Sequence, residues 1–209
     1  MSGSVSRTRM TGAERREQLI GIGRATFADL GYAATSVEEI AERAEVSKPI
    51  VYEHFGGKEG LYAVVVEREV ARLTQLITEG LDGAEHPRDA VQRAADAFLE
   101  YIETERDGFR ILIRDAPVGA SRGSLPGLLG DIAKRAEAIL QREFTARGHE
   151  AATAPLFARA LVGMVAMVGQ WWLETGEPSR REVAVHLTNL AWGGLRGLDL
   201  DGASRYGRR

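Results

Sequence analysis

The sequence predicts an all-α protein of about nine helices, arranged as a small N-terminal part and a larger second part. Almost every segment between the glycines and prolines carries apolar residues at helical spacing. Runs of alternating β-branched residues, which would indicate strands, do not occur. The 209 residues are 44% hydrophobic and 27% charged, which is the composition of a soluble globular protein.

Composition also argues against several kinds of chemistry. Cysteine is absent, so we expect neither disulfides nor thiolate metal sites. The histidines have no metal-binding spacing, and no glycine-rich phosphate loop follows a strand. These observations predict a protein that is not an enzyme and that uses no metal and no cofactor. The first 11 residues are polar and lack the apolar segment of a signal peptide, so a cytoplasmic location is expected.

Helical spacing predicts one helix before residue 35 and six after residue 57. The first covers residues 14–30 and is stopped by the Gly31-Tyr32 pair. The later ones cover residues 58–80, 88–105, 109–114, 125–147, 153–175 and 179–193. Two glycines and two prolines predict a break over residues 117–126.

The stretch from residue 35 to residue 55 predicts a helix, a three-residue turn and a second helix. Thr35 or Ser36 can cap the first helix, with a glutamate three residues on completing a capping box in either register. Ser47 is placed to cap the second helix, and Pro49 falls in its first turn.

The second helix of this stretch has two different faces. Val51 and Phe55 lie four residues apart and are expected to point inward. The outward-facing residues are then Lys48, Ile50, Tyr52 and His54. A short helix with a base, rings and a capped N-terminus on its free face has the geometry to enter a DNA groove. A plain helical hairpin is the alternative interpretation.

An ordered set of residues extends this pattern on both sides. The set comprises Phe27, Gly31-Tyr32, Thr35-Ser36-Val37, Ile40-Ala41, Val46-Ser47-Lys48, Tyr52, His54-Phe55, Lys58-Glu59 and Leu61. In order and spacing, it resembles the DNA-binding domain of TetR-type (TetR/AcrR family) transcription regulators. Glu45 stands where that family usually has glycine in a left-handed turn, so a positive φ is predicted at Glu45. Gly57 stands where the family tends to have a capping serine.

The resemblance implies that the second helix of the motif enters a major groove of a palindromic operator. Lys48 would then contact a guanine or a phosphate, and Pro49 and Ile50 a thymine methyl. The other expected DNA contacts, mainly to phosphates, are Thr35, Ser36, Val37, Ser47, Tyr52, His54 and Lys58. Residues 1–12 are expected to form a disordered arm. Its residues Arg7 and Arg9 either reach a minor groove or lie in a solvated tail.

The segment 153–175 carries an unusual surplus of apolar side chains. Residues 160–168 are apolar all round, and Trp171-Trp172 close the run. Arg159 and Gln170 bound this run, which is shorter than the ~18 residues of a membrane span. A helix apolar on every side is instead expected to be buried on every side, and no membrane partner is expected.

The resemblance also implies a homodimer and a ligand cavity. One face of the segments 153–175 and 179–193 would pair with a second subunit in a four-helix interface. The expected interface residues are Leu161, Gly163, Val168, Trp172, Val183, Leu187 and Leu190. The expected cavity residues are Phe98, Tyr101, Phe109, Ile113, Met164, Met167 and Trp171.

We therefore expect residues 1–57 to form the arm and helix-turn-helix domain, residues 58–80 a connecting helix, and residues 81–209 a regulatory, ligand-binding and dimerisation domain. The favoured function is a DNA-binding transcription regulator, as a homodimeric repressor that a small apolar ligand releases from its operator. The alternatives are a ligand-independent activator or nucleoid-type protein and, less favoured, an all-α carrier or enzyme.

Overall fold

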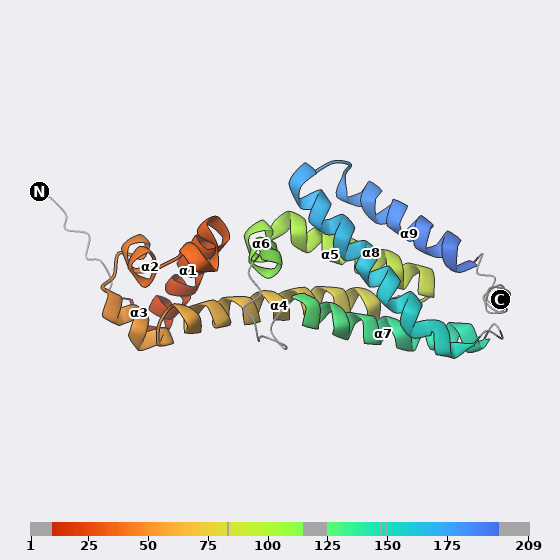
Figure 1. Cartoon of the computed structure of the whole chain (residues 1–209), viewed down its shortest axis with the longest axis horizontal. Coiled ribbons are helices and arrows are strands. Elements are labelled where there is room, and N and C mark those ends of the chain that lie inside the picture. The colour runs from red at the N-terminus through yellow and green to blue at the C-terminus, as the bar shows by residue number, and fades with distance from the viewer. Residues whose placement is uncertain (1–9, 83, 115–124, 147, 149, 197–209) are drawn as a thin grey trace, which may run out of the picture. The chain divides into compact units, whose positions relative to one another are not determined.

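The computed structural model describes residues 10–82, 84–114, 125–146, 148 and 150–196. These residues form nine α-helices and one short 3₁₀ helix, without a strand among them (Figure 1). The predicted all-α fold is thereby confirmed. Arg7 and Arg9, most of the predicted break at 117–126 and the C-terminal residues 197–209 lie outside the described residues.

The chain divides into two compact units, residues 1–68 and residues 69–209. The boundary falls inside helix α4 (Lys58–Asp82), between Arg68 and Glu69. This helix was predicted to be a connecting segment between two domains, over residues 58–80. In the structure, its first turns pack in the first unit and its remainder packs in the second.

The first unit consists of α1 (Gly12–Ala34), α2 (Val37–Arg43), α3 (Lys48–Phe55) and the start of α4. Thr11 begins α1 with a capping box, because its hydroxyl and the Glu14 carboxylate each bind the other's backbone N–H. The fully buried core side chains come from all four helices and include Leu19, Phe27, Ile40, Val51 and Leu61.

The start of α2 and the turn between α2 and α3 can be compared with the predicted caps and turn. Glu45 has φ +53°, as the left-handed turn requires. The predicted cap of α2 is confirmed at Ser36, whose hydroxyl accepts from the backbone N–H of Glu39. The reciprocal half of the predicted capping box is absent, because the Glu39 side chain binds Arg43 instead. Ser47 is the N-cap residue of α3, yet its side chain makes no capping hydrogen bond.

The second unit contains the rest of α4 together with α5 (Pro87–Thr104), α6 (Arg106–Arg114), α7 (Leu125–Ala146), the 3₁₀ helix η1 (Ala151–Thr153), α8 (Ala154–Thr175) and α9 (Arg180–Arg196). α8 packs along α7, and α9 packs along α5 (Figure 1). The largest fully buried side chains of this unit are Tyr101, Phe109, Leu73, Leu99 and Ile102.

Helix α8 is buried on one side only. Ala158, Ala166 and Trp172 pack inside the unit, whereas Leu156, Met167 and Trp171 are 67%, 65% and 52% exposed. The prediction that this helix is buried on every side is therefore wrong for a single chain. By length and composition alone, the segment Ala151–Thr175 could also cross a membrane. Its packing against α7 and α5 is that of a helix in a folded domain.

Candidate nucleic-acid interface and ligand cavity

The outer face of α3 carries the side chains that the sequence placed there. Lys48, Pro49 and Tyr52 are exposed, and Ile50 and His54 are half-buried. Val51 is fully buried and holds the helix to the core. Phe55 is only half-buried, and the Arg16 guanidinium lies 4.9 Å from the centre of its ring. The helix thus rests on Val51 and presents a polar and aromatic face to solvent.

The cations beside this face are already paired. The Lys48 ammonium forms an ion pair with the Glu38 carboxylate of α2. The hydrogen bond from Lys48 holds the pKa of Glu38 below its usual range. Arg43 binds Glu39 at 2.7 Å and Asp29 at 3.2 Å. All three ion pairs are exposed to solvent.

Two predicted DNA contacts have buried side chains. Thr35 is 2% exposed, and its hydroxyl donates to the backbone carbonyl of Gly31 at 2.7 Å. Val37 is 8% exposed and belongs to the core. Their side chains therefore cannot reach DNA, because both are used to join the end of α1 to the start of α2. Ser36 is half-buried, with its hydroxyl on the Glu39 backbone.

Lys58 is also placed differently from the prediction. Its ammonium donates to the backbone carbonyls of Tyr32 and Thr35, at 3.0 and 2.9 Å. It also lies 4.4 Å from the centre of the Tyr32 ring. Lys58 therefore satisfies carbonyls at the end of α1, and the predicted phosphate contact is replaced by a structural role. Periodicity could not reveal this, because the partners are backbone atoms 23 and 26 residues away.

The second unit contains a partly open apolar cavity of about 110 Å³ that is lined by α4, α5, α7, α8 and α9. Ile77, Phe98, Leu140, Val165 and Trp192 contribute to its wall. Glu143 is the one ionisable side chain among its lining residues. The cavity adjoins a polar hollow near the start of α5, with which it shares Glu143 and four apolar residues. The apolar cavity is therefore suited to the apolar part of a ligand, and the adjoining hollow to a polar group of the same ligand.

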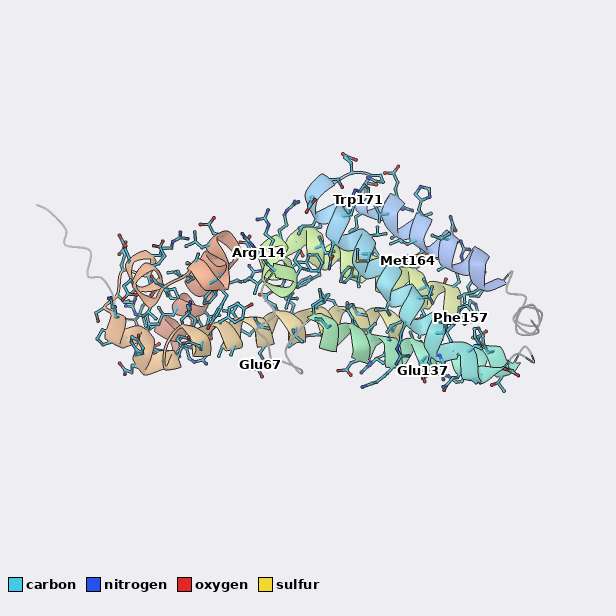
Figure 2. All side chains as sticks on the ribbon, viewed as in Figure 1. Glu67, Arg114, Glu137, Phe157, Met164 and Trp171 are labelled. Atoms are coloured by element: carbon cyan, nitrogen blue, oxygen red, sulfur yellow. The ribbon has the colours of Figure 1, made fainter. Side chains whose placement is uncertain are left out.

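Most of the predicted cavity residues lie elsewhere. Phe98 lines the cavity, whereas Tyr101 and Phe109 are fully buried in the core beside it. Ile113, Met167 and Trp171 are exposed, and Met164 is half-buried outside the cavity wall. Met164 and Trp171 both project from α8 in Figure 2. The error arose because α8 turns Leu161, Val162 and Val165 toward the cavity.

The predicted interface set also divides. Trp172, Val183 and Leu187 are buried within the chain, and Leu161 lines the cavity. Val168 is half-buried, whereas Gly163 and Leu190 are exposed. Leu156 was not among the predicted interface residues, although it begins a stripe at helical spacing. That stripe, the α8 face, comprises Leu156, Ala160, Gly163, Met167 and Trp171, all of them exposed.

Comparison with known proteins identifies the family of this chain, which combines a helix-turn-helix unit with a helical second unit. The family described as "Bacterial regulatory proteins, tetR family" matches residues 19–65. A second description, "Tetracyclin repressor-like, C-terminal domain", matches residues 76–204. The chain belongs to the TetR family. This TetR-family chain is therefore a DNA-binding transcription regulator, and its relatives are regulators rather than enzymes.

One TetR-family relative is similar over most of the chain. The HTH-type transcriptional activator FasR of Mycolicibacterium smegmatis is 33% identical over 187 residues, which cover 87% of this chain and 83% of FasR. The HTH-type transcriptional repressor Rv3405c of Mycobacterium tuberculosis is 32% identical over 102 residues, about half of each chain.

Two solved structures share the fold. A TetR-like regulator from Rhodococcus sp. RHA1 superposes with a TM-score of 0.77 and 29% identity, covering 91% of this chain and all of the other. The fatty acid degradation regulator FadR from Bacillus halodurans has a TM-score of 0.70 and 16% identity, covering 90% and 99%. The second likeness concerns the fold alone.

Proposed function

We propose that this TetR-family protein acts as a homodimer that binds a two-fold symmetric operator and releases it when an apolar ligand enters the second unit. The observation that carries the proposal is the exposed face of α3, with Lys48, Pro49 and Tyr52 presented to solvent. A lysine at a helix N-terminus suits a guanine or a phosphate, and a tyrosine hydroxyl suits a phosphate. Ser36, Ser47, Ile50 and His54 are the remaining proposed contacts.

The α8 face supports the homodimer. Leu156, Met167 and Trp171 on α8 and Leu190 on α9 are each more than half exposed in the single chain. Large apolar side chains gathered on adjacent helices indicate a protein interface. The glycines in this region, Gly163, Gly193 and Gly194, meet no atom within 4 Å at the β-carbon position, so a second helix can approach closely. Two linked α3 helices would also bind two half-sites together with greater affinity than one.

The cavity supports the proposal that the effector is an apolar small molecule. Its wall is aliphatic and aromatic apart from Glu143, so burial of apolar surface would supply most of the binding free energy. We propose that ligand-bound protein has the lower DNA affinity, which makes the protein a repressor. The second candidate is an activator, because FasR, which is similar to this protein over 87% of the chain, is named one.

Selection from a random pool of duplexes tests the DNA-binding proposal. We expect the full-length protein to enrich a palindromic sequence with two half-sites. The affinity for this duplex should fall when Lys48 is replaced by alanine. Enrichment of no sequence, or an unchanged affinity of Lys48→Ala, would contradict the proposed role of α3.

The dye Nile red tests the cavity. We expect its fluorescence to rise on binding, and Ala136→Phe to abolish this rise, because Ala136 lines the cavity. Gln141→Phe is the matched control, since it adds the same ring to an exposed position of α7. An equal loss of dye binding in both variants would contradict the cavity as the binding site.

A further inference from the structure

The ion pair between Glu38 and Lys48 places a carboxylate directly on the proposed DNA-reading surface. Glu38 lies in the first turn of α2, and Lys48 begins α3. Their side chains are 59% and 52% exposed. Such an exposed pair adds little to stability, so its presence at this surface calls for a different physical role.

The pairing of Lys48 affects the charge that the first unit can offer to DNA, because two neighbouring cations are also paired. Arg43 binds Asp29 and Glu39, and Lys58 binds backbone carbonyls. Among the described residues of the first unit, seven lysines and arginines stand against ten aspartates and glutamates. Phosphates attract cations and repel carboxylates, so this unit has a weak electrostatic attraction to arbitrary DNA.

We propose that Glu38 is a specificity-determining residue, which neutralises Lys48 away from the operator and accepts a hydrogen bond from a cytosine on it. The proposal rests on the proposed role of α3 in DNA binding. Away from the operator, a phosphate must compete with Glu38 for the Lys48 ammonium. A phosphate that displaces Glu38 from Lys48 also lies close to the Glu38 carboxylate, which is then unpaired and repels it. Binding to random sequence is therefore penalised at every site.

On the operator, the same two groups match the edge of a G·C pair. In the major groove, guanine presents two acceptors, N7 and O6, and cytosine presents the adjacent N4–H donor. A lysine beside a carboxylate offers the complementary groups side by side, a donor for the guanine acceptors and an acceptor for the cytosine donor. An A·T pair places its N6–H donor between two acceptors, which would repel the carboxylate. Glu38 and Lys48 together therefore favour G·C, with Lys48 on guanine and Glu38 on cytosine.

The test compares Glu38→Gln with Glu42→Gln. Both variants remove one carboxylate from α2, and Glu42 is exposed without an ion pair among the described residues. Any effect of net charge is therefore the same in both. Because the Glu38–Lys48 pair is exposed, neither variant should change the fold, which circular dichroism checks.

Affinity for a random-sequence duplex is the first measurement. We expect Glu38→Gln to raise this affinity about three- to tenfold per dimer, because on each subunit the Lys48 ammonium is then free to meet a phosphate and a carboxylate is removed from its vicinity. Glu42→Gln should raise it by less than about twofold. Equal effects of the two variants would overturn the proposal.

Base preference is the second measurement. Selection with the unaltered protein should yield a G·C pair at one fixed position of each half-site, and selection with Glu38→Gln should lose that preference. An unchanged preference overturns the proposal. Lys48→Ala distinguishes the proposed role of Glu38 from the proposed role of α3. If this variant has unchanged operator affinity, the proposed role of α3 in DNA binding is also wrong. If only the comparison of Glu38 with Glu42 fails, the role of α3 stands.

Discussion

At the scale of single residues, Glu45 holds a conformation that its side chain does not favour. Its φ of +53° closes the turn between α2 and α3, where a β-carbon adds strain. We expect Glu45→Gly to stabilise the protein by about 1 kcal/mol in urea unfolding. Glu42→Gly, in the regular helix α2, should instead destabilise it by about 1 kcal/mol. Destabilisation by both glycines would show that the turn is unstrained.

At Lys58, we expect a substitution to lower the stability of the protein without changing the salt dependence of DNA binding. Lys58→Met keeps the aliphatic stem and removes two charged hydrogen bonds to carbonyls, which should cost about 1–3 kcal/mol of stability. The dependence of DNA affinity on salt should remain unchanged, because the ammonium is held by the backbone carbonyls of Tyr32 and Thr35. Lys48→Met should have the opposite profile, with stability retained and the salt dependence reduced. A reduced salt dependence for Lys58→Met would restore the phosphate contact predicted from sequence.

At the scale of elements, a buried hydrogen bond joins α4 to α5. Tyr101 Oη donates to Glu69 Oε2 at 2.5 Å, and both side chains are buried. Tyr101 also packs edge-on against Phe109 of α6, which packs against Phe98 in the cavity wall. The wall of the cavity is thus in continuous contact with the part of α4 that belongs to the second unit.

Gly108 is what allows α6 to approach this hydrogen bond. A β-carbon at Gly108 would overlap Glu69 Oε2 and lie 2.6 Å from Tyr101 Oη. We expect Gly108→Ala to destabilise the protein by about 1–3 kcal/mol, because the buried pair must move apart. Gly130→Ala on α7 is the control, since a β-carbon there meets no atom within 4 Å. Thermal unfolding compares the two, and equal melting temperatures would contradict the close packing of α6.

The α8 face gives the second prediction at this scale. Met167→Asp should convert the dimer to monomers or aggregates, because burying the new carboxylate between two subunits is costly. Gln141→Asp places the same charge on an exposed position of α7 and should leave the dimer intact. Sedimentation velocity at micromolar concentration measures both. A stable monomer of the unaltered protein would remove the α8 face from the interface.

At the scale of the whole molecule, the sequence predicted elements better than their partners. The limits of α3 follow from Ser47, Pro49 and the glycine after Phe55, which are local signals. The position of Lys58 depends on backbone carbonyls 26 and 23 residues away, which no local pattern shows. Helical spacing likewise identified an apolar α8. It could not show that Trp172 packs inside the chain while Trp171, its neighbour, remains exposed.

The central claim is that two chains bind one palindromic site through their α3 helices. The most direct test is a titration of the selected operator, with the mass of the complex measured by sedimentation. We predict two chains on each duplex, and a loss of at least about 100-fold in affinity when one half-site is scrambled. One chain per duplex, or equal affinity for the intact and half-scrambled sites, would contradict the claim.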